Sequence, residues 1–164
     1  MTQEATRDIL AVLEQDGRAT PEEIAEMTGR SAEDVREVIA AAERDRAIVK
    51  YKAVVNWDRV GEQEVLALVE LRVTPQRDVG FDGVAKRIAR FPEVRSIHLM
   101  SGDYDLSVLL AGRTMQEIAS FVAMRLAALE EVQGTTTHFL LKRFKEDGVI
   151  LDEEETARRL ALAP

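Results

Sequence analysis

The chain has 164 residues, of which 46% are hydrophobic and 32% are charged, and its formal net charge is −8. This length fits one domain or two small ones, and the apolar content is too high for a disordered chain. The absence of cysteine excludes disulfides, thiolate metal sites and cysteine nucleophiles. The negative charge argues against indiscriminate nucleic-acid binding, although it leaves room for a local basic face.

The sequence gives no sign of a membrane or export segment. No stretch approaches the roughly 20 consecutive apolar residues that cross a membrane. Residues 1–4 (MTQE) bring in an acid at once, and they are not followed by the apolar region of a signal peptide. We therefore expect a cytoplasmic protein with no membrane partner.

Three helices are predicted in the first 44 residues. Apolar residues recur at helical spacing over 6–16, and residues 20–23 (TPEE) start a second helix with a capping box and a proline at its first position. Gly29 is the expected left-handed end of that helix. Ser31 caps a third helix, with Asp34 at its third position. Two helices joined by a short glycine-containing turn, after a preceding helix, are the layout of a helix-turn-helix.

The segment that follows is rich in β-forming residues. Residues 47–55 (AIVKYKAVV) predict a strand that forms a wing or an arm of the helix-turn-helix domain. We place this domain at 1–55 and a polar linker at 56–63.

From residue 64 the apolar spacing predicts the order β-α-β-β-α-β. The elements are a strand at 64–74, a helix at 79–91, a hairpin over 94–110 with its turn at 101–103, a helix capped by Thr114 with Glu117 in a second capping box, and a strand at 132–142. This is the ferredoxin-like arrangement, so the fold class is α+β. One face of its sheet lacks helices, which favours dimerisation. We place this domain at 64–142, and a C-terminal tail, a short helix or a frayed end, at 143–164.

Three short segments carry a family resemblance. Residues 99–106 (LMSGDYDL) contain a G-x-Y-D turn, and residues 132–137 (VQGTTT) read V-x-x-T-x-T. Residues 47–51 (AIVKY) are similar to G-V-I-x-x-Y, with alanine in place of glycine and one residue fewer before the tyrosine. Together with the order of elements over 6–142, they resemble the Lrp/AsnC family of transcriptional regulators. The resemblance implies dimers built through the ferredoxin-like domain, assembly up to octamers, and an amino acid or related metabolite bound between dimers.

Basic residues gather in and after the second half of the helix-turn-helix. The candidate DNA contacts are Arg30, Ser31, Arg36, Arg44, Arg46, Lys50 and Lys52. A capped, solvated helix start or a charged edge strand is the other interpretation of these residues. Residues 1–60 hold nine Arg or Lys against thirteen Asp or Glu, and the third helix begins with acids. This acidity favours an alternative function, a metabolite-binding oligomeric protein whose helix-turn-helix no longer reads DNA.

The hairpin and the last strand hold the candidate effector site. Its residues are Met100, Ser101, Gly102, Asp103, Tyr104, Asp105, Thr135, Thr136 and Thr137, which the family resemblance favours as ligand contacts. Asp105 lies within a strand beside apolar residues, where a carboxylate needs donors from backbone N–H groups or from a ligand ammonium. Turn chemistry and strand propensity are the other explanation for these residue types.

No set of residues predicts catalysis, and we expect no enzyme activity, no metal and no cofactor beyond a small-molecule effector. His98 and His138 are the only histidines, and they do not have the spacing of a metal site. The sequence contains no G-x-S-x-G nucleophile motif, no G-x-G-x-x-G and no P-loop. The predicted partners are double-stranded DNA, an amino-acid-like effector and further copies of the chain.

Overall fold

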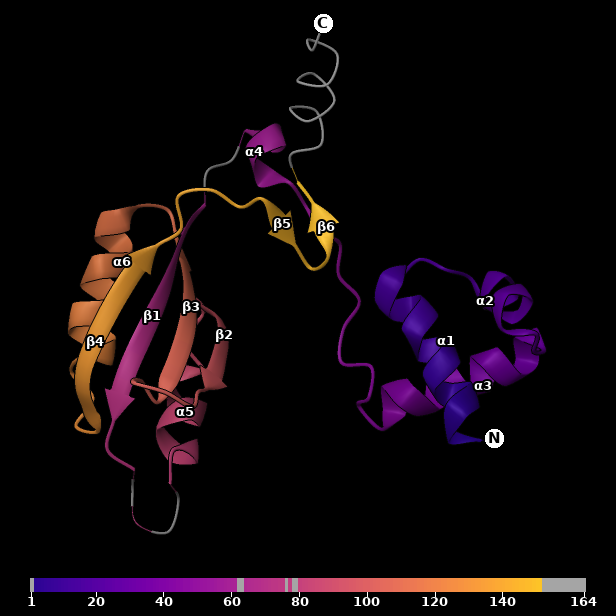
Figure 1. The fold of residues 1–164 in the computed structure, drawn as a ribbon, viewed down its shortest axis with the longest axis horizontal. Helices are drawn as coiled ribbons and strands as arrows, with labels where there is room; N and C mark the ends of the chain where they lie inside the picture. Colours follow the sequence, from indigo (N-terminus) through magenta and orange to yellow (C-terminus); the bar gives the residue numbers. More distant parts are fainter. Residues whose placement is uncertain (1, 62–63, 76, 78–79, 152–164) are drawn as a thin grey trace, which may run out of the picture. The chain divides into compact units, whose positions relative to one another are not determined.

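The computed structural model describes residues 2–61, 64–75, 77 and 80–151 (Figure 1). The chain divides into two compact units, Met1–Val55 and Asn56–Pro164. Each unit has a hydrophobic core of its own.

The first unit consists of three helices, α1 (Gln3–Gln15), α2 (Pro21–Thr28) and α3 (Ala32–Arg44). Their apolar stripes meet in a small core made by Ile9, Ile24, Ala25, Val35 and Val38. The predicted helix-turn-helix is confirmed, because α2 and α3 follow one another across a three-residue turn.

Short-range capping fixes the ends of these helices. The Thr20 hydroxyl accepts a hydrogen bond from the Glu23 N–H at 3.3 Å, and the Glu23 carboxylate accepts one from the Thr20 N–H at 2.8 Å. Gly29 adopts the predicted left-handed conformation, with φ of 66°. The first helix begins earlier than predicted, at Gln3, because the Thr2 side chain accepts a bond from the Ala5 N–H.

The strand predicted at 47–55 is wrong, since this segment has no regular secondary structure. A strand needs a neighbour for its backbone groups, and the described part of this unit offers no second extended segment. The segment instead folds back on α3. The Ile48 N–H donates to the Ala42 carbonyl at 3.0 Å, and the Tyr51 hydroxyl donates to the Glu43 carboxylate at 3.0 Å.

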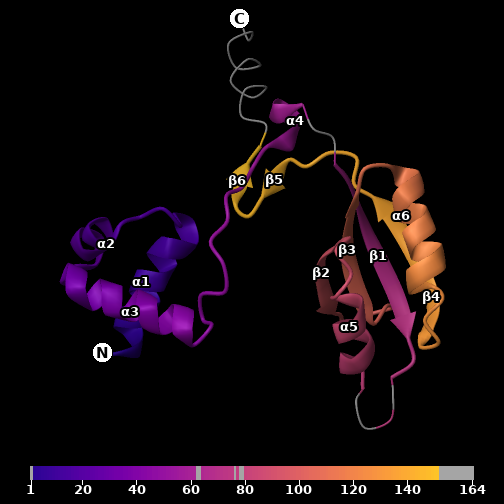
Figure 2. The same ribbon diagram turned by 180° about the vertical axis from the view of Figure 1, so that it is seen from behind.

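The second unit is built on a four-stranded antiparallel sheet in the order β2-β3-β1-β4 (Figure 2). Its elements are α4 (Trp57–Val60), β1 (Val65–Val73), α5 (Asp82–Ile88), β2 (Val94–Leu99), β3 (Leu106–Gly112), α6 (Met115–Phe121), the π-helical turn η1 (Val122–Leu126), β4 (Val132–Phe139), β5 (Lys145–Glu146) and β6 (Val149–Ile150). The predicted β-α-β-β-α-β order is confirmed.

One face of the sheet packs under α5, α6 and η1. From Ala67 onward the buried residues of β1 alternate, and Ala67, Val69 and Leu71 contribute to one core together with residues of all three helical segments. The opposite face carries mixed side chains. The register aligns two rows across it, Ser96–Leu109–Leu68–His138 and His98–Ser107–Glu70–Thr136.

Several elements of this unit differ from the prediction. The expected linker at 56–63 contains α4, and the expected tail at 143–164 contains the small hairpin of β5 and β6. The side chain of Asn56 ties these parts together by donating to the Leu151 carbonyl at 3.0 Å. The acidic run 152–155 and Val79, the predicted start of the helix at 79–91, lie outside the described residues.

The helix after Thr114 also departs from the prediction. Thr114 caps it as expected, but the Glu117 carboxylate accepts from the N–H of Arg113 at 2.8 Å, so the capping bond reaches one residue further back. Met115, the first residue of this helix and an apolar one, is 52% exposed. Side chains on a helix tilt toward its N-terminus, so the first helical residue projects past the part that packs on the sheet.

Candidate functional site

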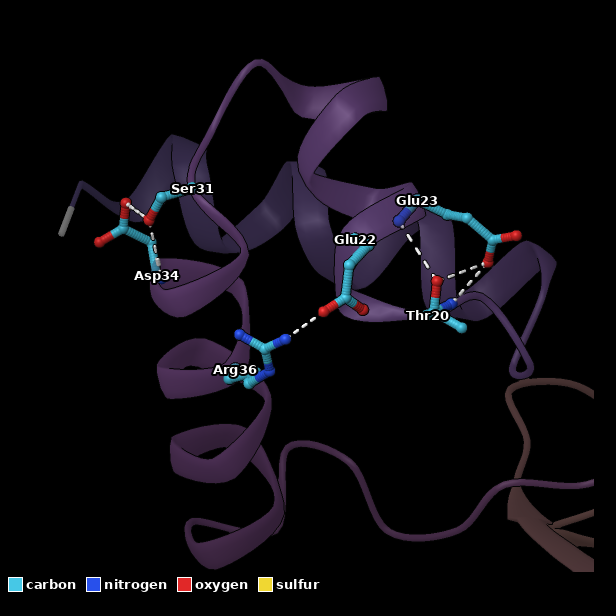
Figure 3. A network of polar contacts seen from close by, with 6 residues as sticks. All are labelled: Thr20, Glu22, Glu23, Ser31, Asp34 and Arg36. Atoms are coloured by element: carbon cyan, nitrogen blue, oxygen red, sulfur yellow. Dashed lines mark hydrogen bonds and ion pairs between the residues drawn. The ribbon is translucent and has the colours of Figure 1, made fainter.

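The beginning of α3 is capped by a side chain predicted to contact DNA. The Ser31 hydroxyl accepts from the Asp34 N–H at 3.1 Å and donates to the Asp34 carboxylate at 2.7 Å (Figure 3). The hydroxyl group is therefore engaged in holding the helix end. Asp34 and Glu33 place two negative charges in the first turn of α3, where they interact favourably with the positive end of the helix dipole.

Arg36 lies one turn further along α3 and points toward α2. Its guanidinium forms an ion pair with the Glu22 carboxylate (Figure 3). Both side chains are more than half exposed, at 55% and 62%. An exposed pair of this kind contributes at most about 1 kcal/mol, so the guanidinium can exchange Glu22 for a DNA partner.

Arg30 is the most enclosed of the predicted DNA contacts in this turn. Its guanidinium lies 3.7 Å from the Asp8 carboxylate of α1, and its side chain is 29% exposed. Its Nε atom is buried and has no hydrogen-bond partner within the described part of the chain. Arg30 therefore packs as part of the domain while presenting only a fraction of its charge to solvent.

The remaining basic candidates lie at the exposed end of α3 and beyond. Arg44 pairs with Asp45 at 3.7 Å, and Arg46, Lys50 and Lys52 have exposed side chains. Arg46 adopts a positive φ of 58°, which turns the chain away from the helix. These residues form a locally basic stretch after α3.

The hairpin between β2 and β3 is wider than the predicted tight turn. It is closed by a bond from the Met100 N–H to the Asp105 carbonyl at 2.8 Å, which leaves residues 101–104 in the loop. Gly102 has φ of 149°, a conformation that side-chain-bearing residues rarely adopt.

Asp105 finds its hydrogen-bond donor in the backbone of β1. Its carboxylate accepts from the Val73 N–H at 2.7 Å, and its own N–H donates to the Leu71 carbonyl at 3.0 Å. The pairing of β1 with β4 shifts register between Arg72 and Val73, and Asp105 satisfies the Val73 N–H at this irregularity. Of the two predicted donors, backbone or ligand, the structure shows the backbone.

Tyr104 connects the hairpin to the last strand. Its hydroxyl lies 3.0 Å from the Thr136 hydroxyl, and the Arg72 guanidinium lies 5.8 Å from the centre of its ring. Arg72 also donates to the Asp103 carbonyl at 3.4 Å. These contacts bring β1, the hairpin and β4 together into one polar cluster, formed by Arg72, Asp103, Tyr104 and Thr136, which we call the hairpin cluster.

The three threonines of β4 do not share one face of the sheet. Thr135 and Thr137 pair with Leu71 and Val69, which are fully buried under the helices. Thr136 pairs with Glu70 and lies on the opposite face with Tyr104. A single pocket cannot be lined by all three hydroxyl groups from one side of the sheet.

Sequence reasoning missed two members of this face. Arg72 was not singled out, although an arginine between the apolar Leu71 and Val73 marks the solvent side of a strand. His138 falls within the strand predicted at 132–142 and has no metal-site spacing, and the structure places its Nε2 atom 3.1 Å from the Glu70 carboxylate. The alternation within β4 predicts the face of the sheet on which His138 lies. Its partner Glu70 could not be predicted in this way, because it lies 68 residues earlier in another strand.

In the described ranges, no cluster of three or more histidine, cysteine or acidic side chains has the geometry to hold a metal ion. No helix in those ranges is long and apolar enough to cross a membrane.

Comparison with known proteins connects both units to one family. Residues 66–150 match the family model described as the Lrp/AsnC ligand binding domain, and residues 3–49 match the model described as winged helix-turn-helix DNA-binding. The uncharacterized HTH-type transcriptional regulator YugG of Bacillus subtilis strain 168 is 42% identical over 162 residues, which is 98% of each chain. The leucine-responsive regulatory protein of Rhizobium meliloti strain 1021 is 28% identical over 138 residues, covering 84% of this chain and 88% of that protein.

Solved structures share the fold. The transcriptional regulator NMB0573 of Neisseria meningitidis, crystallised in complex with L-Met, superposes with a TM-score of 0.71 and 22% identity over 94% of this chain and 99% of that one. AsnC of E. coli gives a TM-score of 0.65 and 17% identity over 87% and 94%. With a ligand-binding-domain match over half of the chain and a relative along nearly all of it, this protein belongs to the Lrp/AsnC family of helix-turn-helix, DNA-binding transcriptional regulators.

Proposed function

We propose that the protein is a sequence-specific transcriptional regulator whose second unit senses an amino acid or a related small metabolite bound between dimers. One observation carries this proposal: the chain combines a complete, capped helix-turn-helix with a ferredoxin-like unit. In that unit the G-x-Y-D hairpin contacts β4 through Tyr104 and Thr136. Each half supplies one function, DNA reading or effector binding.

In the DNA-reading half, α3 enters the major groove with its first turns toward the base edges. Arg36 is the candidate for base contact, because its guanidinium is exposed and its ion pair with Glu22 is weak. Arg30, Arg44, Arg46, Lys50 and Lys52 then serve as phosphate contacts. A dimer presents two such helices to a two-fold-related operator.

In the sensing half, the hairpin cluster offers both hydrogen-bond donors and hydrogen-bond acceptors. The Arg72 guanidinium suits a ligand carboxylate, and the Asp103 carbonyl with the Tyr104 and Thr136 hydroxyls suits a ligand ammonium. The names of two relatives support an amino acid: one is called leucine-responsive, and another was crystallised with L-Met. Because the Asp105 carboxylate already serves Val73, we assign ligand contact first to these four residues.

The sheet face that carries the hairpin cluster also supports assembly. Within the described residues no helix packs on it, and its central Leu68 and Leu109 are only half-buried in one chain. A second copy on this face removes them from water and forms a dimer, from which tetramers to octamers are built. An effector that binds one arrangement of dimers better than another shifts the population toward it.

One observation favours a second function, a metabolite-binding oligomer whose helix-turn-helix no longer reads DNA. The first turn of α3 carries Glu33 and Asp34, Arg36 is neutralised by Glu22, and the Ser31 hydroxyl is occupied by Asp34. These contacts place negative charge where DNA phosphates approach.

Genome-wide mapping of DNA bound by the protein in its own cells separates the two functions. The regulator predicts discrete bound sites upstream of genes, with occupancy that changes when the effector is added. The alternative predicts no enrichment above the background of unrelated DNA.

A thermal-shift series with the proteinogenic amino acids tests the effector. A ligand at about 100-fold above its Kd stabilises the folded protein by roughly 2.7 kcal/mol. Replacing Arg72 by methionine, which keeps an unbranched side chain but removes the charge, should abolish the shift. An undiminished shift in that variant would place the effector elsewhere.

A further inference from the structure

A cavity lies in the second unit, at the end of β3 far from the hairpin cluster. It has a volume of about 230 Å³ and is lined by Glu93, Leu110, Ala111, Gly112, Arg113, Glu117, Ile118 and Phe121. The hairpin cluster adjoins the first residue of β3 and this cavity adjoins its last. At about 3.3 Å per residue, the seven residues of β3 place the two sites roughly 20 Å apart.

One carboxylate oxygen of this cavity has no hydrogen-bond partner among the described residues. The Oε2 atom of Glu93 is buried and accepts no hydrogen bond from any described residue. A buried carboxylate oxygen without a donor is costly, so its place in a native structure calls for a donor such as a water molecule or a ligand. The backbone around it is fixed, because the Glu93 carbonyl accepts from the Ala111 N–H at 2.9 Å.

The other two charges of the cavity neutralise one another. Arg113 lies 3.2 Å from the Glu117 carboxylate, which also accepts the Arg113 backbone N–H at 2.8 Å. The backbone bond and then the guanidinium hold the pKa of Glu117 below its usual value of 4.5, so this acid stays ionised and paired. The Arg113 side chain is 90% exposed and stands at the mouth. Of the two acidic side chains in the lining, Glu93 is therefore the one with an oxygen atom that no described residue satisfies.

The rest of the wall is apolar and rigid. The Phe121 ring packs edge-on against Phe91, with ring centres 5.3 Å apart, which fixes its position. Gly112 allows Ile118 to lie close to β3, since a Cβ at this position would come within 2.9 Å of the Ile118 Cγ1 atom. The shape of the cavity thus depends on the absence of a side chain at Gly112.

We propose that this cavity is a second ligand site, which binds a small molecule consisting of an ammonium group on a compact apolar body. The ammonium donates to the Glu93 carboxylate, and the apolar body lies against Leu110, Ile118 and Phe121. The volume corresponds to about eight water molecules at roughly 30 Å³ each, which admits a ligand of about eight heavy atoms. Such a ligand is a free amine or a small α-amino acid, whose carboxylate would then meet Arg113 at the mouth.

The test follows isoleucine methyl resonances of the full-length protein during titration with 3-methylbutylamine, 3-methylbutanol and L-leucine. We expect the amine to shift the Ile118 methyl signal more than any other isoleucine signal, and the alcohol to bind at least about tenfold more weakly, because it lacks the charge that Glu93 recognises. This comparison needs no substitution. If L-leucine shifts Ile118 as strongly as the amine does, the ligand class is an amino acid; if only the amine does, the class is a free amine.

The matched variants are Glu93→Gln, which keeps the size but removes the charge, and Glu130→Gln, which changes an exposed glutamate outside the cavity. Glu93→Gln should weaken amine binding at least about tenfold, whereas Glu130→Gln should leave it unchanged. Equal binding of amine and alcohol, equal binding by Glu93→Gln and the unmodified protein, or no Ile118 shift with any probe would overturn the proposal. None of these readouts depends on DNA binding or on the hairpin cluster, so failure here is separate from failure of the proposed function.

Discussion

Asp105 shows how one side chain serves the fold at the place where the family resemblance expects a ligand. Its carboxylate fills the gap in hydrogen bonding at the irregularity of β1, where it accepts from the Val73 N–H at 2.7 Å. The same residue closes the hairpin through its carbonyl, which accepts from Met100. Loss of its carboxylate is therefore expected to change stability whether or not a ligand is present.

Replacing Asp105 separates the role of its carboxylate in the fold from a role in ligand binding. Asp105→Ala leaves the Val73 N–H without a partner in a partly buried position, which should lower the free energy of unfolding by about 1–3 kcal/mol. Asp105→Asn keeps an acceptor oxygen and should lose less. Urea unfolding without any ligand measures both. If the alanine variant is as stable as the unmodified protein, the Val73 contact does not support the fold.

Arg36 is the second residue whose role can be isolated. Arg36→Ala should reduce affinity for an operator by about 1–3 kcal/mol, because the proposed base contact is lost, while affinity for random DNA changes less. Arg18→Ala, in the loop before α2, is the matched control for removing one positive charge. Fluorescence anisotropy with both DNAs measures the difference. An equal loss on operator and random DNA would make Arg36 a phosphate contact.

At the scale of elements, the ends of the helices were predictable because their determinants are local. The capping box of Thr20 and Glu23, the cap at Ser31 and the left-handed Gly29 depend on residues at most four positions apart. The strands of the sheet were predictable from the alternation of apolar and polar residues. The strand expected at 47–55 failed because strand formation needs a distant partner, which residue types within the segment do not reveal.

The candidate site was predictable only in part for the same reason. The hairpin and β4 were identified from motifs, and the structure brings Tyr104 and Thr136 into contact. The donor to Asp105 could not be predicted, since the Val73 N–H is available only because β1 and β4 shift register beside it. The separation of Thr136 from its two neighbours follows from strand alternation and was available in the sequence.

A double-mutant cycle measures the interaction energy between Tyr104 of the hairpin and Thr136 of β4. Tyr104→Phe and Thr136→Val each remove one hydroxyl, and each should lower the free energy of unfolding by about 0.5–1.5 kcal/mol. The double variant should lose less than the sum, because both changes break the same bond. Strict additivity in urea unfolding would show that the two hydroxyl groups are not coupled.

The start of α2 has a pH dependence of defined sign. Bonds from the Thr20 N–H and then from the Thr20 hydroxyl lower the pKa of Glu23 from its usual value of 4.5. The carboxylate therefore contributes stability above pH 4.5, and this contribution is lost as the pH falls through the lowered pKa of the folded state. At pH 7 the Glu23→Gln variant should melt at a lower temperature than the unmodified protein. At pH 3 the two melting temperatures should differ little. A difference that persists unchanged at pH 3 would exclude the charge as its cause.

At the scale of the whole molecule, function divides between two units with separate cores. The net charge of −8 makes general attraction to DNA weak, so in the proposed regulator specific binding comes from the basic stretch in and after α3. The acids at the start of α3 then act against non-specific binding, since they repel phosphates unless base contacts compensate. A regulator of this composition gains selectivity by lowering its affinity for random DNA.

The most direct test of the regulator function is the ratio of affinities for a selected genomic fragment and for random DNA of the same length at physiological salt. We predict a ratio of about 10³ or more, together with an affinity whose logarithm falls with the logarithm of salt concentration by about 0.9 per phosphate contact. A ratio near one for every fragment selected from the genome would contradict the account and leave the metabolite-binding oligomer as the function of this protein.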